Sequence, residues 1–63
     1  MEAWVRVAIF QQKVEAHMAR DFLRASGIQA QLRADTGQSI RWNMELLVLE
    51  GDEAEAKRLL SDK

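Results

Sequence analysis

Hydrophobic and polar residues alternate with a period of two in two segments of the chain, and a third segment is a short apolar run. This pattern predicts three β-strands. The segments are residues 4–10, 28–34 and 44–49. The third segment, MELLVL, is apolar with little alternation. We therefore expect it to be a central strand that is covered on both sides.

A helical repeat separates the first two predicted strands. Its apolar stripe consists of Val14, Met18, Ala19, Phe22 and Leu23. Gly27 follows the repeat. We expect Gly27 to end the helix, because the residue after a helix commonly adopts a positive φ that costs glycine little.

A second, shorter helix is predicted after the third strand. Gly51 and Asp52 interrupt the apolar run, and Asp52 with Glu55 has the spacing of a capping box. Glu53 and Lys57 are spaced as an i,i+4 ion pair on the exposed side. The apolar stripe of this helix is Ala56, Leu59 and Leu60.

The order of elements predicts an α+β fold of the truncated ferredoxin-like type, β-α-β-β-α, as a single domain over residues 1–63. A right-handed crossover joins the first two strands, and a loop at residues 35–43 returns the third strand antiparallel to the second. We expect a three-stranded antiparallel sheet in the order 1-3-2, with both helices on one face. A complete ferredoxin-like unit has a fourth strand beside the first, so the first strand is expected to have an open edge.

Strand alternation also predicts which side chains lie on the sheet face that the helices leave open. Val5, Val7, Ile9, Met44, Leu46 and Val48 are expected to face the helices. The open face is expected to hold Trp4, Ala8, Phe10, Leu47 and Leu49. An apolar patch of this kind normally marks a contact surface. The predicted interface residues are Trp4, Arg6, Ala8, Phe10, Arg41, Trp42, Leu47 and Leu49.

Composition narrows the classes of function. A hydrophobic fraction of 48% and a charged fraction of 30% are ordinary for a globular domain. The chain has no cysteine, which excludes disulfides and thiolate zinc sites and fits a cytoplasmic protein. A net charge of -1 disfavours binding by phosphate neutralisation, and no apolar run is long enough to span a bilayer. So small a domain often oligomerises to complete its core.

The sequence offers little catalytic chemistry. His17 lies near Glu15 and Asp21, which invites a metal or general-base interpretation. Helical phase instead places His17 on the flank of the first helix, where it forms an ordinary surface pair with Asp21. Helix capping explains the acidic residues at the start of the second helix. Without a nucleophile elbow or a glycine-rich loop before a helix, we expect neither an enzyme nor a cofactor or metal site.

The arginines support two further hypotheses. Arg6, Arg33 and Arg41 are expected to gather on the uncovered sheet face or its rim. With the aromatic residues Trp4, Phe10 and Trp42, they would form a surface that stacks the bases of single-stranded nucleic acid. The leucines and glutamates of the third strand disfavour this reading. A small-ligand sensor that uses the loop at residues 35–43 and Arg41 is the other alternative.

The segments EAHMARDFLRASGIQAQL and LLVLEGDEAEAKRLL resemble a family of short bacterial signal-transducing proteins without an established function. The matching positions are Glu15, Ala16, Leu23, Gly27, Ile28, Ala30, Leu32, Val48, Asp52, Ala56, Leu59 and Leu60. The resemblance implies a βαββα module similar in fold to PII-type nitrogen regulators. It implies no catalytic residue, and the loop at residues 35–43 lacks the length and glycine pattern with which PII-type proteins hold nucleotide.

Taken together, these features predict a non-enzymatic regulatory or protein-binding module. We expect it to self-associate, or to bind a protein partner, through the open sheet face and the edge of the first strand. This expectation rests on the open edge of the first strand, on the apolar face beside it, and on the small hydrophobic core that a domain of this size can form.

Overall fold

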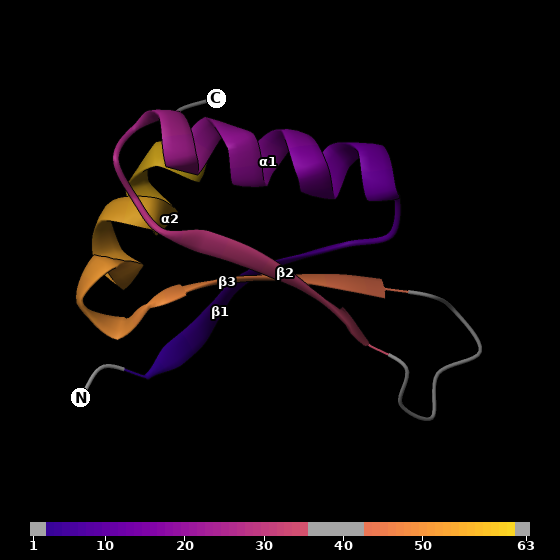
Figure 1. Cartoon of the computed structure of the whole chain (residues 1–63), viewed down its shortest axis with the longest axis horizontal. Coiled ribbons are helices and arrows are strands. Elements are labelled where there is room, and N and C mark those ends of the chain that lie inside the picture. Colours follow the sequence, from indigo (N-terminus) through magenta and orange to yellow (C-terminus); the bar gives the residue numbers. More distant parts are fainter. Residues whose placement is uncertain (1–2, 36–42, 62–63) are drawn as a thin grey trace.

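The computed structural model describes residues 3–35 and 43–61. They form one three-stranded antiparallel sheet with two helices packed on the same face (Figure 1). The elements in chain order are β1 (Trp4–Phe10), α1 (Lys13–Ala25), β2 (Ala30–Asp35), β3 (Asn43–Leu49), a 3₁₀ turn η1 (Glu50–Asp52) and α2 (Glu53–Ser61). The strand order is β1-β3-β2, so the predicted α+β architecture and sheet order are confirmed.

β3 is the central strand and is buried from Met44 to Val48 without a break. The low alternation of its sequence predicted this. On the helix side, Leu46 and Val48 are fully buried and pack with Leu23 of α1 in the core. The core therefore lies between β3 and the two helices.

The side of α1 that packs against the sheet differs in part from the predicted apolar stripe. Ala16, Ala19 and Leu23 are buried, whereas Val14 and Met18 are exposed. Two alanines on the contact side let the helix approach the sheet closely, and this contact decides how the helix is rotated about its axis. The predicted stripe was thus wrong at Val14 and Met18.

Gly27 ends α1 with a positive φ, as predicted, and the end of the helix is a Schellman motif. Gly27 has a φ of 88°. The amide of Ile28 donates to the carbonyl of Leu23 at 3.0 Å, and the amide of Gly27 donates to the carbonyl of Arg24 at 3.0 Å. Ile28 and Leu23 then meet in the core, which is the hydrophobic contact that accompanies this motif.

A β-bulge at Val7 changes the face that the second half of β1 presents. Arg6 pairs with Leu47 and Ala8 pairs with Leu46, so Val7 is an extra residue without a partner on β3. The prediction that Ala8 and Phe10 lie on the open face is therefore wrong. Both pack toward the helices with the core.

The same bulge moves Ile9 to the open face. Ile9 pairs with Glu45, two positions along β3 from Leu47 and on the same side of the sheet. Strict alternation had placed Ile9 against the helices. That prediction is wrong because one inserted residue shifts every later side chain to the other face.

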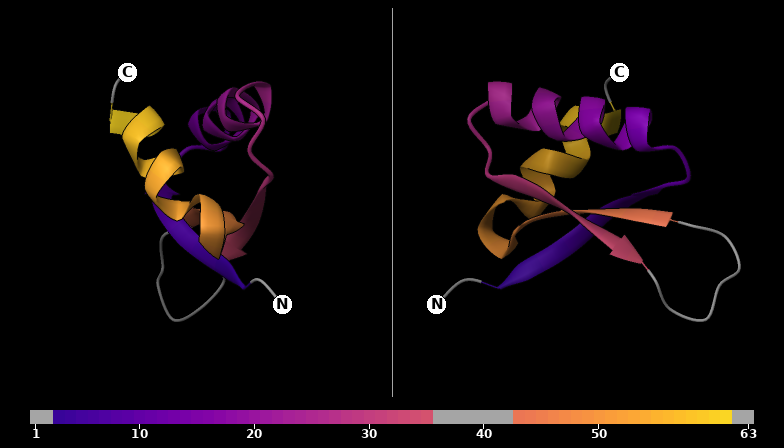
Figure 2. Two further views of the ribbon diagram at one scale, coloured as in Figure 1. Left: turned by 90° about the vertical axis from the view of Figure 1, so that its left-hand side faces the viewer. Right: turned by 45° about the vertical axis from the view of Figure 1, so that its right-hand side comes forward.

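α2 follows β3 through the turn η1, which the sequence did not predict. The amide of Glu50 donates to the carbonyl of Ala3 at 2.8 Å and ties this turn to the start of β1. Ala56 is buried against the core, and Lys57 pairs with Glu53 at 3.0 Å, as the i,i+4 spacing predicted. Figure 2 shows both helices on one side of the sheet, with α2 steeply inclined. The predicted loop at residues 35–43 lies, apart from its ends, outside the described residues.

Candidate functional site: the open face of the sheet

The sheet face opposite the helices carries the candidate site, here called the open face. Neither helix covers it in the views of Figures 1 and 2. Strand register assigns its side chains, because residues opposite one another in an antiparallel pair lie on the same face. The described members are Trp4, Arg6 and Ile9 of β1, Gln31 and Arg33 of β2, and Asn43, Glu45, Leu47 and Leu49 of β3.

Glu45 lies at the centre of the open face and binds one arginine from each neighbouring strand. Nε and Nη2 of Arg33 donate to Oε1 of Glu45 at 2.9 and 2.6 Å. Nη1 of Arg6 lies 3.5 Å from Oε2, which is longer than a charge-assisted hydrogen bond. These three residues, the Arg–Glu–Arg cluster, span the whole width of the sheet.

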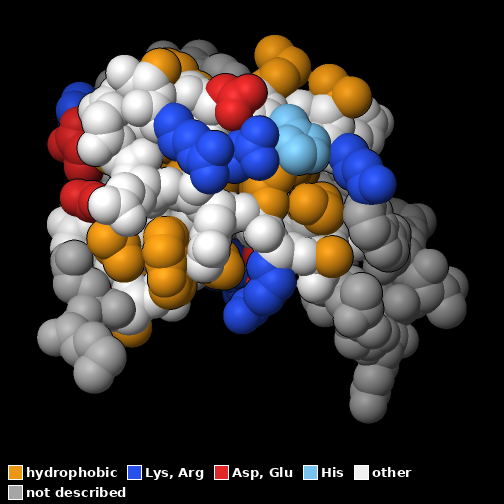
Figure 3. All heavy atoms as spheres, viewed as in Figure 1, with side chains coloured by type: hydrophobic (Ala, Val, Ile, Leu, Met, Phe, Trp, Pro, Cys, Tyr) orange, Lys and Arg blue, Asp and Glu red, His pale blue; other side chains and the backbone are white. Residues whose placement is uncertain are grey.

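The cluster is asymmetric in exposure. The Glu45 side chain is only 10% exposed, whereas the side chains of Arg6 and Arg33 are 55% and 65% exposed. No helix lies over Glu45, so its burial comes from long side chains on the edge strands, whose apolar stems cover the central strand. One carboxylate neutralises one of the two guanidinium groups. The cluster keeps an excess of one positive charge, and Figure 3 shows basic side chains on this side of the sheet as well as over α1.

Apolar side chains flank the cluster along β1. Trp4 is 41% exposed and Ile9 is 48% exposed, which is high for residues of their size. Leu49 is half-buried, and Leu47 is only 4% exposed beneath its neighbours. The accessible apolar surface of the open face therefore follows the edge strand β1, and Leu47 contributes little to it.

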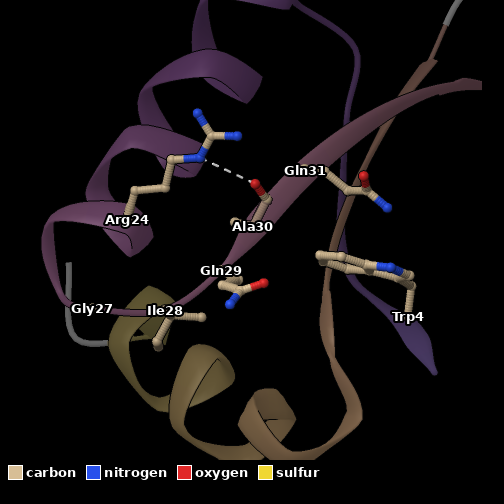
Figure 4. Close-up of a pocket in the computed structure, with 7 residues that line it drawn as sticks. All are labelled: Trp4, Arg24, Gly27, Ile28, Gln29, Ala30 and Gln31. Atoms are coloured by element: carbon tan, nitrogen blue, oxygen red, sulfur yellow. Dashed lines mark hydrogen bonds between the residues drawn. The ribbon is translucent and has the colours of Figure 1, made fainter. Parts of the chain in front are cut away.

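A hollow of about 440 Å³ lies between Trp4 and the start of β2. In Figure 4 the indole of Trp4 points from β1 toward Gln29 and Gln31. Nε of Arg24 donates to the carbonyl of Ala30 at 3.2 Å and holds the end of α1 against β2 on the same rim. The hollow combines an aromatic wall with amide side chains, next to the basic cluster.

The structure brings together only part of the predicted interface. Trp4, Arg6 and Leu49 lie on the open face, and Leu47 lies there but is buried. Arg33 was also expected near this face and is confirmed there. Ala8 and Phe10 are on the helix side, while Arg41 and Trp42 lie outside the described residues.

The sequence interpretation missed Ile9 and Glu45 as members of the open face. Ile9 was predicted to face the helices because nothing in WVRVAIF indicates the bulge at Val7. Glu45 was read only as a residue unlike those of RNA-binding sheets, although it is the one polar residue of MELLVL. A lone carboxylate in a central strand needs a charged partner to be buried. That requirement is the signal that points to the cluster.

Chemistry elsewhere in the described residues is limited. His17 is exposed on α1, and Asp21 pairs with Arg20 at 3.2 Å. The described ranges bring together no group of three or more His, Asp or Glu side chains that could hold a metal ion. A second hollow, of about 810 Å³, lies on the helix side of the sheet between β1 and the two helices, with Met18 and Leu60 among its apolar walls.

A comparison with protein families matches residues 4–62 to the family described as "Putative prokaryotic signal transducing protein". The chain belongs to this family. The match confirms the predicted resemblance and covers every strand and helix of the fold. Searches of curated proteins and of solved structures found no match.

The description of this family indicates a role in signalling. Within the described residues, no helix of this family member is long and apolar enough to cross a membrane. The family description assigns no site residue. The site must therefore be argued from the open face itself.

Proposed function

We propose that the chain is a non-enzymatic cytoplasmic signalling module that self-associates through the edge of β1 and the adjoining open face. The observation that carries this proposal is the position of Ile9, an exposed apolar residue on the open face of an edge strand. Exposed apolar surface beside an unpaired strand edge favours pairing with a second chain.

The geometry of β1 supports pairing at this edge rather than at β2. Among the described strands, β1 pairs only with β3, so one side of its backbone has no strand partner. Its exposed open-face residues include Trp4 and Ile9, whereas β2 presents Gln31 and Arg33 on that face. Antiparallel pairing of two β1 edges about a twofold axis would extend the sheet to six strands and place both open faces on the same side.

The chemistry of the open face supports binding rather than catalysis. Its central carboxylate, Glu45, is held by Arg33 through two hydrogen bonds and lies within ion-pair distance of Arg6. A carboxylate engaged in this way is poorly placed to transfer protons to a substrate. The arrangement instead orders charged side chains for recognition.

Sedimentation velocity on the full chain, from 5 to 200 µM, tests self-association (about the range of weak homodimers). We expect a dimer that dissociates on dilution. Ile9→Lys, which places a charge at the paired edge, should shift the species toward the monomer without unfolding it. Val14→Lys is the matched control, because Val14 is also a β-branched apolar residue, is more exposed than Ile9 (68% against 48%) and lies on α1. A monomer at every concentration, or equal effects of the two variants, would overturn the proposal.

A further inference from the structure

The Arg–Glu–Arg cluster has one guanidinium group more than its carboxylate can neutralise. Arg33 uses two nitrogens on the same oxygen of Glu45, and Arg6 approaches the other oxygen only at 3.5 Å. Arg6 is therefore the less engaged of the two cations. Its exposed guanidinium group has the fork geometry that binds a second carboxylate through two parallel bonds.

We propose that the open face binds an acidic segment of a partner protein, with a carboxylate of that segment held by Arg6 beside the Arg33–Glu45 pair. This proposal extends the proposed function by naming the chemistry of the partner, and rests on the binding role assigned there to the open face. Charge complementarity carries it, since the cluster has a net positive charge and lies on the open face beside Trp4, Ile9 and Gln31.

The residues beside the cluster also determine which side chain should lie next to the carboxylate in the bound segment. Trp4 lies two residues before Arg6 on the same strand and the same face, so their side chains are spaced by roughly 7 Å along β1. An extended peptide has the same spacing between residues i and i+2. A segment with an apolar residue two positions from a glutamate or aspartate would place the apolar side chain against Trp4 while its carboxylate reaches Arg6.

A carboxylate fits better than a nucleic-acid backbone. A phosphodiester backbone gains affinity from a row of cations that are free to neutralise its phosphates. The cluster has only two guanidinium groups, and both already share the carboxylate of Glu45. The whole chain carries a net charge of -1. A single carboxylate with an apolar neighbour needs only the local excess charge and the exposed indole of Trp4.

Fluorescence anisotropy with a labelled peptide of the pattern Leu-Ser-Glu-Ser-Leu tests the proposal. The full chain should bind it, and a peptide with Gln in place of Glu should bind about tenfold more weakly, the loss typical of one charge-assisted bond. Arg6→Gln should weaken binding of the Glu peptide by a similar factor. The same variant should leave binding of the Gln peptide unchanged, because the lost contact is shared.

Matched controls separate a specific site from general attraction. Arg20→Gln removes an arginine from α1 and should leave the affinity for the Glu peptide unchanged. Equal binding of the Glu and Gln peptides, or equal losses for the Arg6 and Arg20 variants, would overturn the proposal. Labelled oligothymidylate is the third probe. Binding of that probe but not of the Glu peptide would assign the face to nucleic acid and reject the acidic segment.

The two proposals fail separately. Sedimentation without peptide reports self-association alone, and the comparison of the Glu and Gln peptides reports the acidic partner alone. If Ile9→Lys gives a monomer that still binds the Glu peptide, both proposals stand. A monomeric wild-type chain that binds the Glu peptide would reject self-association alone. A dimer that binds the Glu and Gln peptides equally well would reject the acidic partner alone.

Discussion

Arg33 donates two hydrogen bonds to one oxygen of Glu45, from Nε at 2.9 Å and from Nη2 at 2.6 Å. The two residues are directly opposite in the β2–β3 ladder. Glu45 is nearly buried, while most of the Arg33 side chain is exposed. The pair therefore satisfies a carboxylate in the central strand without a second layer of structure above it.

Replacement of Glu45 by Gln should destabilise the fold, because it removes the charge that holds Arg33 and Arg6 on either side of β3. We expect a loss of about 1–2 kcal/mol in the free energy of unfolding, kept modest by the solvent around both arginines. Urea denaturation measures it. Glu55→Gln is the control, since its pair with Arg58 lies on the exposed side of α2 and should contribute little. Equal losses in the two variants would contradict a special role for Glu45.

The β-bulge makes opposite predictions for two adjacent residues of β1. Phe10→Ala should cost about 2 kcal/mol, less than a fully buried phenylalanine, because Phe10 is half-buried against the core. Ile9→Ala should cost less than about 1 kcal/mol, because Ile9 is largely exposed. Strict alternation reverses this order. Thermal unfolding of both variants under one condition decides between the two arrangements.

Leu47→Glu should unfold or strongly destabilise the chain rather than only change its contacts with partners. Leu47 is 4% exposed, and a second carboxylate would lie near Glu45 on the same face. We expect a loss of about 3 kcal/mol or more. Gln31→Glu introduces the same charge at the exposed position opposite Leu47 and should change stability little. Near-native circular dichroism and melting of Leu47→Glu would show that Leu47 is accessible after all.

Gly27→Ala should destabilise the end of α1 through the backbone alone. A φ of 88° strains any residue with a Cβ, although a Cβ at this position would meet no atom within 4 Å. We expect a loss of about 1–2 kcal/mol. Gly27→Asn should cost less, because asparagine tolerates the left-handed region. If alanine and asparagine cost the same in chemical denaturation, the left-handed backbone is not the cause.

The sequence was sufficient for the order of the strands and α-helices along the chain and for the strand order in the sheet. The period of two in Trp4–Phe10, the period of the first helix and Gly27 are local signals, and each reports local backbone geometry. The apolar run of β3 marked the central strand for a different reason, since a strand with a neighbour on each side is buried along its length.

Only the tertiary structure decided which side chains share the open face. The bulge at Val7 is set by how β1 pairs with β3, and it moves Ile9 onto that face and Phe10 off it. Likewise, Glu45 meets Arg6 and Arg33 only because three strands distant in sequence lie side by side. Period and propensity act over a few neighbouring residues, whereas register and charge pairing depend on contacts between strands, and the candidate site consists of such contacts.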